Sequence, residues 1–304
     1  MASSRVSVVV VSYNTREKLR RCLLAIEPEH EVIVIDNASS DGSADMVASD
    51  FPHVKLIRNR VNRGFGGANN QGIDASSREL VLFLNSDAYA FRGAIDRLAQ
   101  EFVSRDIVGA GGQLLNPDGS RQLSSANKLT LWALFCEQTL LEKLDPHSRF
   151  FSPYWNSDKV GDTTTPVDQV MGACLMIRPR ERFDERFFLY VEDTELCYRL
   201  RRHGKILYVP AAKFTHELGS SSADSRWVAV ARYNRGKELF FRLHSGPFTM
   251  ATAWLMNRMG ALLRLLIWTG ATFGTMGKRA EFKQKAVTFW RVLTAPFSGP
   301  RRPA

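Results

Sequence analysis

Short runs of aliphatic residues alternate with amphipathic segments through the first 85 residues of this chain. Strands are predicted at residues 6–11, 31–35, 54–57 and 80–84, and helices at 15–26, 44–49 and 68–75. The strand runs are apolar along their whole length, so both faces of each strand must be buried. Such strands, separated by helices, are typical of a mostly parallel sheet covered on both faces. We therefore predict an α/β fold.

Polar residues follow several of these strands. Asn14, Asp36 and Asp87 each come at or just after the end of an apolar run. In open α/β sheets, ligands bind at the carboxyl ends of the strands. The sequence therefore predicts a binding site that contains these three side chains.

A second acidic spot lies far along the chain. Glu192, Asp193 and Glu195 come directly after the aromatic and aliphatic run at 187–191. Unpaired charge beside apolar surface is costly, so such clusters usually bind a cation or move a proton. Together with Asn85-Ser86-Asp87, this cluster predicts a metal-assisted transfer enzyme with a separate carboxylate base.

The net charge of +10 is unevenly distributed. Residues 205–304 carry 16 Lys/Arg against 4 Asp/Glu, whereas residues 1–204 carry 25 against 27. A basic tail on a near-neutral body indicates an anionic surface as partner, and we expect a membrane and not a nucleic acid. Four cysteines at 22, 136, 174 and 197 lack paired spacing, so we expect no disulfide and a reducing cytosol. Residues 8–11 are too short for a secretory signal.

The tail after about residue 240 has its own character. Residues 248–276 are almost continuously apolar, interrupted by Asn257, Arg258 and Arg264, which share about one third of a helical wheel with Thr269. The next segment, 278–291, is basic and contains Trp290. This pattern favours a helical, in-plane membrane anchor near anionic headgroups. A buried bundle or a homodimer interface is the alternative.

Residues 113–167 lose the strand–helix rhythm and carry several aromatic residues. We interpret them as a lid or acceptor wall, with an irregular packing insertion as the alternative. Regular structure is predicted again at 169–177, and a helix at 194–203 that ends at Gly204. The chain is thus divided into a catalytic domain, 1–240, and a tail, 241–304.

Six segments occur in the order seen in one enzyme family. They are VVVSYN at 9–14, VIDNASSDGS at 34–43, NRGFGGANNQG at 62–72, LNSD at 84–87, MGAC at 171–174 and the Glu-Asp pair at 192–193. In these segments the chain resembles the inverting glycosyltransferases of family 2, and above all their rhamnosyltransferase branch. The resemblance covers roughly residues 5–240. It implies the GT-A fold, a Rossmann-like nucleotide-binding domain.

The resemblance also implies a donor site for a nucleotide sugar. Asp36 is expected to accept a hydrogen bond from the base, although a helix cap is its ordinary alternative, which Ser40 or Asp41 could supply instead. Glycines of the 62–72 segment let the backbone approach a phosphate or sugar. The residues assigned to the donor are Ser12, Asn14, Asp36, Asn37, Arg63, Gly64, Asn69, Asn85 and Gly172.

Asn85-Ser86-Asp87 occupies the place of the family's DxD motif, whose last Asp binds a divalent ion on the diphosphate. Asn85 replaces the first Asp, so bidentate acidic coordination is left open. Oxygen ligands suit Mg²⁺ or Mn²⁺. Asp87 is the predicted ligand, and His216 is a second candidate, for which a structural role is the alternative.

Inversion requires a base that deprotonates the acceptor hydroxyl. By resemblance this base is Asp193, with Glu192 orienting the acceptor or its loop. Glu195 is expected only to stabilise the start of a helix and to pair with Arg199.

Taken together, the sequence predicts a single-addition transferase, since the signature of processive polymerases is missing around Arg226-Trp227. The resemblance implies a dTDP- or UDP-linked donor, with dTDP-L-rhamnose favoured, and a lipid-linked glycan acceptor in surface polysaccharide synthesis. We expect a peripheral enzyme at the cytoplasmic face of the membrane. A non-catalytic, membrane-associated glycan-binding subunit of the same fold is the alternative.

Overall fold

A nine-stranded sheet forms the centre of the computed structural model, which describes residues 5–156, 161–217, 226–275 and 279–296. The strands are β1 (Val6–Ser12), β2 (Glu31–Asp36), β3 (Lys55–Arg58), β4 (Leu80–Asn85), β5 (Ala88–Ala90), β6 (Ile107–Leu115), β8 (Thr165–Val167), β10 (Cys174–Ile177) and β11 (Lys205–His216), with β7 (Ser125–Ala126) and β9 (Gln169–Val170) paired separately. The helices are α1 (Arg16–Leu24), α2 (Ser43–Asp50), α3 (Gly64–Ala75), α4 (Ala94–Ala99), α5 (Leu131–Gln138), the 3₁₀ turn η1 (Leu141–Lys143), α6 (Glu192–Leu200), α7 (Arg226–Ser245), α8 (Pro247–Gly274) and α9 (Ala280–Thr294).

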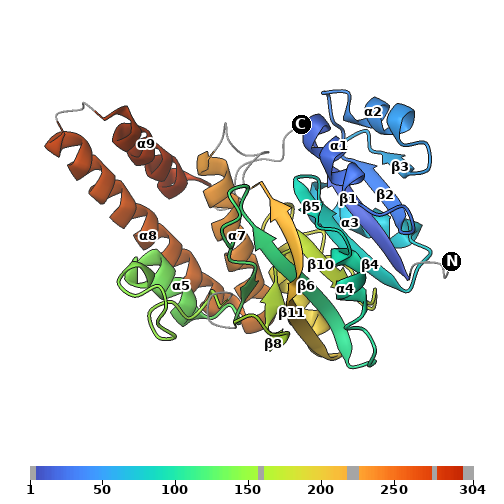
Figure 1. Ribbon diagram of the computed structural model, residues 1–304. Helices are drawn as coiled ribbons and strands as arrows, with labels where there is room; N and C mark the ends of the chain where they lie inside the picture. Colours follow the sequence, from blue (N-terminus) through green and yellow to red (C-terminus); the bar gives the residue numbers. More distant parts are fainter. Residues whose placement is uncertain (1–4, 157–160, 218–225, 276–278, 297–304) are drawn as a thin grey trace.

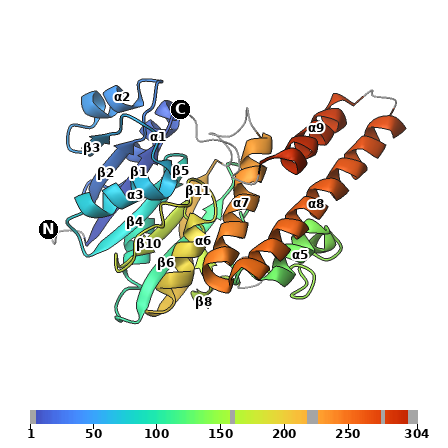
Figure 2. The ribbon, with the colours of Figure 1, turned by 180° about the vertical axis from the view of Figure 1, so that it is seen from behind.

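The sheet has the order β3-β2-β1-β4-β10-β6-β11-β5, and β8 pairs with β11. Strands β3, β2, β1 and β4 are mutually parallel, while β10 runs antiparallel to both β4 and β6. Helices cover both faces, as the views from opposite sides in Figure 1 and Figure 2 show. The predicted α/β sheet is confirmed.

Alternating side chains of β1 explain the two helical layers. Val6, Val8 and Val10 belong to an apolar cluster with residues of α1, α2 and α4 on one face, whereas Val9 belongs to a cluster with residues of α3 and α6 on the other. All four side chains are buried. Because successive residues of a strand point to opposite faces, an uninterrupted apolar run is what a doubly covered strand needs.

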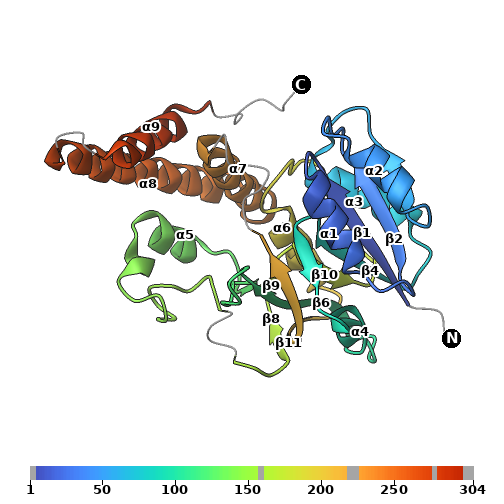
Figure 3. The same cartoon turned by 45° about the horizontal axis from the view of Figure 1, so that its top comes forward.

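The C-terminal helices form a separate layer beside the sheet. Figure 3 shows α8 and α9 side by side, extending away from it. A third apolar cluster joins this layer to the rest through Leu134 of α5, Phe187 and Val191 before α6, Phe240 of α7 and Ala253 of α8. The domain boundary predicted after residue 240 falls within α7. Among the helices that the structure describes, none combines the length and apolarity needed to cross a membrane.

Candidate active site

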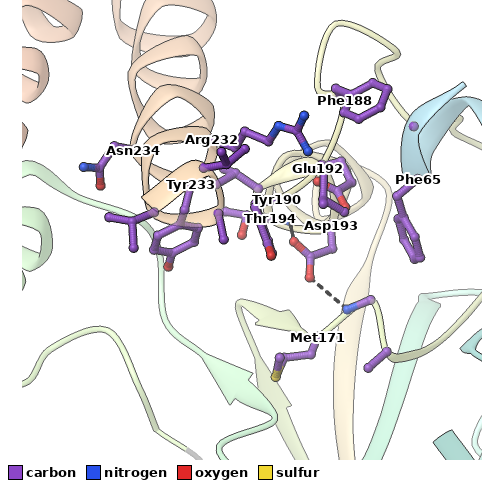
Figure 4. Close-up of a pocket in the computed structure, with 18 of the residues that line it drawn as sticks. Phe65, Met171, Phe188, Tyr190, Glu192, Asp193, Thr194, Arg232, Tyr233 and Asn234 are labelled. Carbon is purple, nitrogen blue, oxygen red and sulfur yellow. Dashed lines mark hydrogen bonds between the residues drawn. The ribbon is translucent and has the colours of Figure 1, made fainter. Parts of the chain in front are cut away.

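A cleft of about 1260 Å³ opens between the carboxyl edge of the sheet and the C-terminal helices. The predicted site residues that line it are Asn37, Gly64, Asn85, Asp87, Gly172, Glu192, Asp193 and His216. Asp87 and Asp193, more than a hundred residues apart in the chain, thus share one cavity, and Asp36 directly precedes a lining residue. Figure 4 shows the side of the cleft that is formed by the start of α6 and by α7.

Asp36 ends β2 and is buried, with one carboxylate oxygen satisfied and the other not. Its Oδ2 accepts a hydrogen bond from the Ser39 amide at 3.1 Å. Its Oδ1 is buried and has no hydrogen-bond partner within the described parts of the chain. A buried acceptor without a donor is costly, so it fits an incoming N–H group. Asp36 does not cap α2: the N-cap residue is Gly42, and Asp41 accepts from the amide of Ser43, the first residue of the helix, at 3.0 Å.

Asn37 holds the glycine-containing loop before α3. Its Nδ2 donates to Asn62 Oδ1 at 2.9 Å, and its Oδ1 accepts from the Arg63 amide at 3.0 Å. Gly64 has φ +77°, and a Cβ there would clash with the Phe188 carbonyl, which accepts from the Phe65 amide at 2.9 Å. Gly64 thus makes room for the backbone that leads to α6. Because Gly64 also lines the cleft, the expected approach of a phosphate or sugar to this loop stays a prediction.

Besides Asp36, four residues predicted to contact the donor do not line the cleft. Ser12 is buried and hydrogen-bonds Thr15 Oγ1 at 3.0 Å. Asn14 accepts from the Ser40 amide at 2.7 Å and so holds the loop after β2. Asn69 donates to the Phe65 carbonyl within its own helix, and the Arg63 side chain extends toward Glu185. These polar groups are satisfied inside the protein, and the sequence does not show which partners they find.

The corner around Asp87 has the donor set of a divalent metal site. His216 Nε2 lies 3.4 Å from Asp87 Oδ1 and 3.4 Å from Asn85 Nδ2. On its other side, His216 Nδ1 lies 3.0 Å from Gln122 Oε1, while Gln122 Nε2 donates to the His216 carbonyl at 2.5 Å. Because Gln122 Oε1 can only accept, Nδ1 carries the proton and Nε2 presents its lone pair beside the carboxylate. These residues fit a bound cation.

Another group of potential metal ligands lies elsewhere. Ligand atoms of Glu29, His30 and Asp96 lie within 4.8 Å of one another. His30 directly precedes β2, so the group lies at the amino end of the strands, whereas the cleft is at the carboxyl end. Two of its three residues are exposed, and surface acidic groups are common without a metal.

A strained corner positions the predicted base. Tyr190 and Val191 both have left-handed backbone, with φ +74° and +71°, which is rare for any side chain and exceptional for a β-branched one. Helix α6 begins immediately afterwards, so Glu192 and Asp193 occupy its first turn, two residues before the predicted start. Asp193 Oδ2 accepts from the Gly172 amide at 2.8 Å and Oδ1 from the Thr194 amide at 2.7 Å.

Both carboxyl groups have raised pKa values. Burial raises the pKa of Asp193, and the hydrogen bonds from Gly172 and Thr194 oppose that rise. Burial, with the neighbouring Asp193 charge, holds the pKa of Glu192 well above its ordinary value. Glu192 Oε2 is also buried without a hydrogen-bond partner among the described residues. The two carboxyl groups therefore differ. The Asp193 charge adds to the effect of burial at Glu192 and favours its protonated form, whereas two amide donors stabilise the carboxylate form of Asp193.

Glu195 has the ordinary role expected of it. Its carboxylate accepts from Arg199 Nε at 2.7 Å and Nη2 at 2.8 Å, in a bidentate pair one helical turn apart. His244 of α7 approaches the same carboxylate at 3.2 Å. This cluster ties α6 to α7 and lies outside the cleft lining.

Several cleft residues were missed by the sequence reasoning. Arg232 of α7 lines the cleft, with its guanidinium 5.1 Å from the centre of the Phe188 ring. It has no carboxylate or hydrogen-bond partner in the described chain, and burial lowers its pKa. Its local sequence does not distinguish it from the other basic residues of α7, Arg226 and Arg235 among them. Tyr154 and Trp155 also line the cleft, which agrees with the predicted acceptor wall.

Sequence comparison identifies related proteins. Residues 7–157 match the model for "Glycosyl transferase family 2". The N-acetylglucosaminyl-diphospho-decaprenol L-rhamnosyltransferase of Mycobacterium tuberculosis is 28% identical over 278 residues, which cover 84% of this chain and 90% of the relative. The succinoglycan biosynthesis protein ExoO of Rhizobium meliloti is 31% identical over 256 residues, covering 79% of this chain and 69% of the relative.

Comparison with solved structures identifies the fold. The mannosyltransferase PcManGT of Pyrobaculum calidifontis, solved with GDP-Man and Mn²⁺, matches with a TM-score of 0.52 at 14% identity, over 95% of this chain and 85% of that chain. TarS of S. aureus matches with a TM-score of 0.50 at 14% identity, over 96% and 81%. The predicted GT-A fold is confirmed.

Proposed function

Because the chain belongs to glycosyl transferase family 2, we propose that it transfers L-rhamnose from dTDP-rhamnose, with inversion, to a lipid-linked glycan. The activity named for the mycobacterial relative supports both the sugar and the lipid-linked acceptor. A relative in succinoglycan biosynthesis supports a role in polysaccharide synthesis. A UDP-linked hexose is the alternative donor.

The observation that carries this proposal is one cleft that contains both Asp193 and the Asp87–His216 pair. Asp193, fixed by two backbone amides, removes the proton of the attacking hydroxyl. Glu192, in its protonated form, donates a hydrogen bond that orients the acceptor. Asp87 and His216 would hold Mg²⁺ or Mn²⁺, which would supply positive charge to neutralise the departing nucleotide diphosphate. Asp36 and Asn37 receive the base.

Arg232 completes the cleft in this proposal. A half-buried guanidinium with no anionic partner among the described residues fits a phosphate group of one substrate. Both the donor and a lipid-diphosphate acceptor carry such groups. Arg232 lies on α7, on the side of the cleft that Figure 4 shows.

The base is tested by Asp193→Asn. Transfer should fall by about 10²–10⁴-fold, because a general base contributes that much, while donor affinity stays within about twofold. Asp45→Asn, an exposed surface carboxylate paired with Arg58, is the matched control and should leave both unchanged. Loss of donor binding together with transfer would show that Asp193 is structural.

Donor and metal are tested by thermal unfolding with dTDP-rhamnose, dTDP-glucose, UDP-glucose and GDP-mannose, each with Mg²⁺, Mn²⁺ or EDTA. A ligand that binds the native state raises the unfolding temperature. The largest rise is expected with dTDP-rhamnose and a metal, and EDTA should abolish transfer. Full activity after complete chelation would refute the metal site.

A further inference from the structure

Helix α8 packs against the protein through its small and polar residues. The buried residues of this helix are Ala253, Asn257, Gly260 and Ala261. Asn257 Nδ2 donates to Glu238 Oε1 of α7 at 2.9 Å. Gly260 lies so close to α5 that a Cβ there would clash with Gln138. The inner face of α8 is therefore narrow and partly polar.

Both arginines of α8 are also used inside the protein. Arg258 donates to the carbonyls of Val292, Leu293 and Ala295, at 2.8 Å for the first and last, and so caps the end of α9. Arg264 donates to the carbonyls of Gln138 and Glu137 at 2.8 and 2.7 Å and caps α5. Unpaired carbonyls at helix C-termini attract such cations. The polar arc seen in the sequence thus faces the protein and not solvent.

The outer face of α8 is a continuous stripe of large apolar side chains. The stripe consists of Phe248, Leu255, Met259, Leu262, Leu266 and Phe273, which are 44–89% exposed. At 100° per residue these six positions fall within about 60° of the helical circumference, nearly opposite Asn257 and Ala253. They extend along almost the whole 28-residue helix, about 40 Å at 1.5 Å per residue.

We infer that this α8 stripe lies flat on the anionic surface of a lipid bilayer. Helix α8 contains no acidic residue, and described residues 226–275 and 279–296 carry 11 Lys/Arg against 2 Asp/Glu. Helix α9, which packs along α8, exposes Trp290, Arg291 and Lys283. Apolar side chains flanked by Trp and cations match the boundary between acyl chains and anionic headgroups.

Charge favours a bilayer over a second copy of the chain as the occupant. Two copies joined through their stripes would bring two strongly basic surfaces together, and like charges repel. Anionic headgroups carry the opposite charge, and each basic residue near such a surface adds attraction. An in-plane position also requires no membrane-spanning helix.

This inference rests on the proposed function for its purpose, because a lipid-linked acceptor lies in the same bilayer. Ala261 and Arg264, on the inner side of α8, line the active-site cleft. The stripe and the cleft are therefore separated by one helix, a thickness of about 10 Å. Docking the stripe would bring the cleft close to the headgroups that carry the acceptor.

Vesicle co-sedimentation of the full chain tests the surface, since truncation before α8 would expose the core around Ala253. Vesicles of phosphatidylcholine with and without phosphatidylglycerol are compared for wild type and for Leu262→Glu/Leu266→Glu. The matched control is Val103→Glu/Leu144→Glu, which places the same charge at two exposed apolar sites outside the tail, with exposed fractions of 88% and 74% against 44% and 62% for the stripe pair. We expect at least tenfold weaker partitioning for the stripe variant, partitioning close to wild type for the control, and stronger wild-type binding with phosphatidylglycerol.

Equal binding of the stripe variant and wild type would overturn the inference, as would no wild-type binding. A wild-type dimer that the stripe variant converts to a monomer, without vesicle binding, would assign the stripe to a second copy and overturn it too. If the glutamates prevent folding, Leu262→Ser/Leu266→Ser replaces them. Asp193→Asn should bind vesicles normally. Transfer to a short-chain soluble acceptor should survive in the stripe variant, so failure of the proposed function and failure of this inference give different results.

Discussion

Replacing Gly236 by alanine should slow transfer by displacing the strained corner that carries Glu192 and Asp193. Gly236 is buried in the middle of α7, directly against that corner. An added Cβ would lie 2.8 Å from the Tyr190 carbonyl oxygen and 2.8 Å from Val191 Cγ2. Ordinary contacts between such atoms begin at about 3.4 Å, so the corner or the helix must move by roughly 0.6 Å.

A second glycine supplies the matched comparison. Gly270 lies within α8, and an added Cβ there meets no atom within 4 Å. Alanine in a helix is favoured over glycine by about 1 kcal/mol at either site. Overpacking costs about 1–3 kcal/mol, and only at Gly236. We therefore expect Gly270→Ala to stabilise the protein by about 1 kcal/mol, and Gly236→Ala to be about 1–3 kcal/mol less stable than Gly270→Ala.

The two alanine variants should also differ in transfer activity. Misplacement of a reacting group by about 1 Å costs about 10²-fold, so a shift of half that size in Asp193 predicts a kcat about tenfold lower for Gly236→Ala. The donor affinity should be unchanged, because the strand ends are untouched. Urea unfolding followed by Trp fluorescence, together with steady-state kinetics, measures both effects. If the two alanine variants proved equally stable and fully active, the corner would not be rigidly held by α7.

Three further predictions concern the cleft. Gln122→Leu removes the acceptor of His216 Nδ1 and should weaken Mn²⁺ binding, measured by electron paramagnetic resonance with the nucleotide present, by about 10–100-fold; unchanged affinity would remove Gln122 from the site. Glu192→Gln removes a carboxyl group whose pKa is raised in the folded protein. In the wild type, as pH increases above 4.5, Glu192 therefore loses its proton in the unfolded state before it does so in the folded state. Wild type should therefore lose stability relative to the variant by about 1.4 kcal/mol per pH unit until the folded pKa is reached, and parallel urea-unfolding profiles would contradict this. Arg232→Gln should raise KM by about 10–100-fold for whichever substrate places its phosphate there, donor or acceptor, and no change in either KM would show that Arg232 binds neither.

Local pattern was sufficient for the four parallel strands β1–β4 of the nine-stranded sheet and for much of the cleft. The uninterrupted apolar run of β1 predicts a strand covered on both faces, and the topology then brings the strand ends around Asn37 and Asp87 to one edge. Asp193 could be placed in the same cleft only through the family resemblance. Ser12, Asn14 and Asn69 show what sequence pattern does not predict. Each side chain is of a kind that often binds ligands, but each makes a hydrogen bond within the protein instead.

The sequence by itself determined the α/β core, the family and the carboxylates available for catalysis, because burial periodicity and motif order are properties of neighbouring residues. Only the tertiary structure decided which polar groups are satisfied internally and which face the cleft. Helix α8 is the clearest case: Asn257, Arg258 and Arg264 turn inward because the ends of α5 and α9 and the side of α7 supply their partners. The direction in which an amphipathic helix faces depends on what packs against it, and those contacts come from segments distant in the chain.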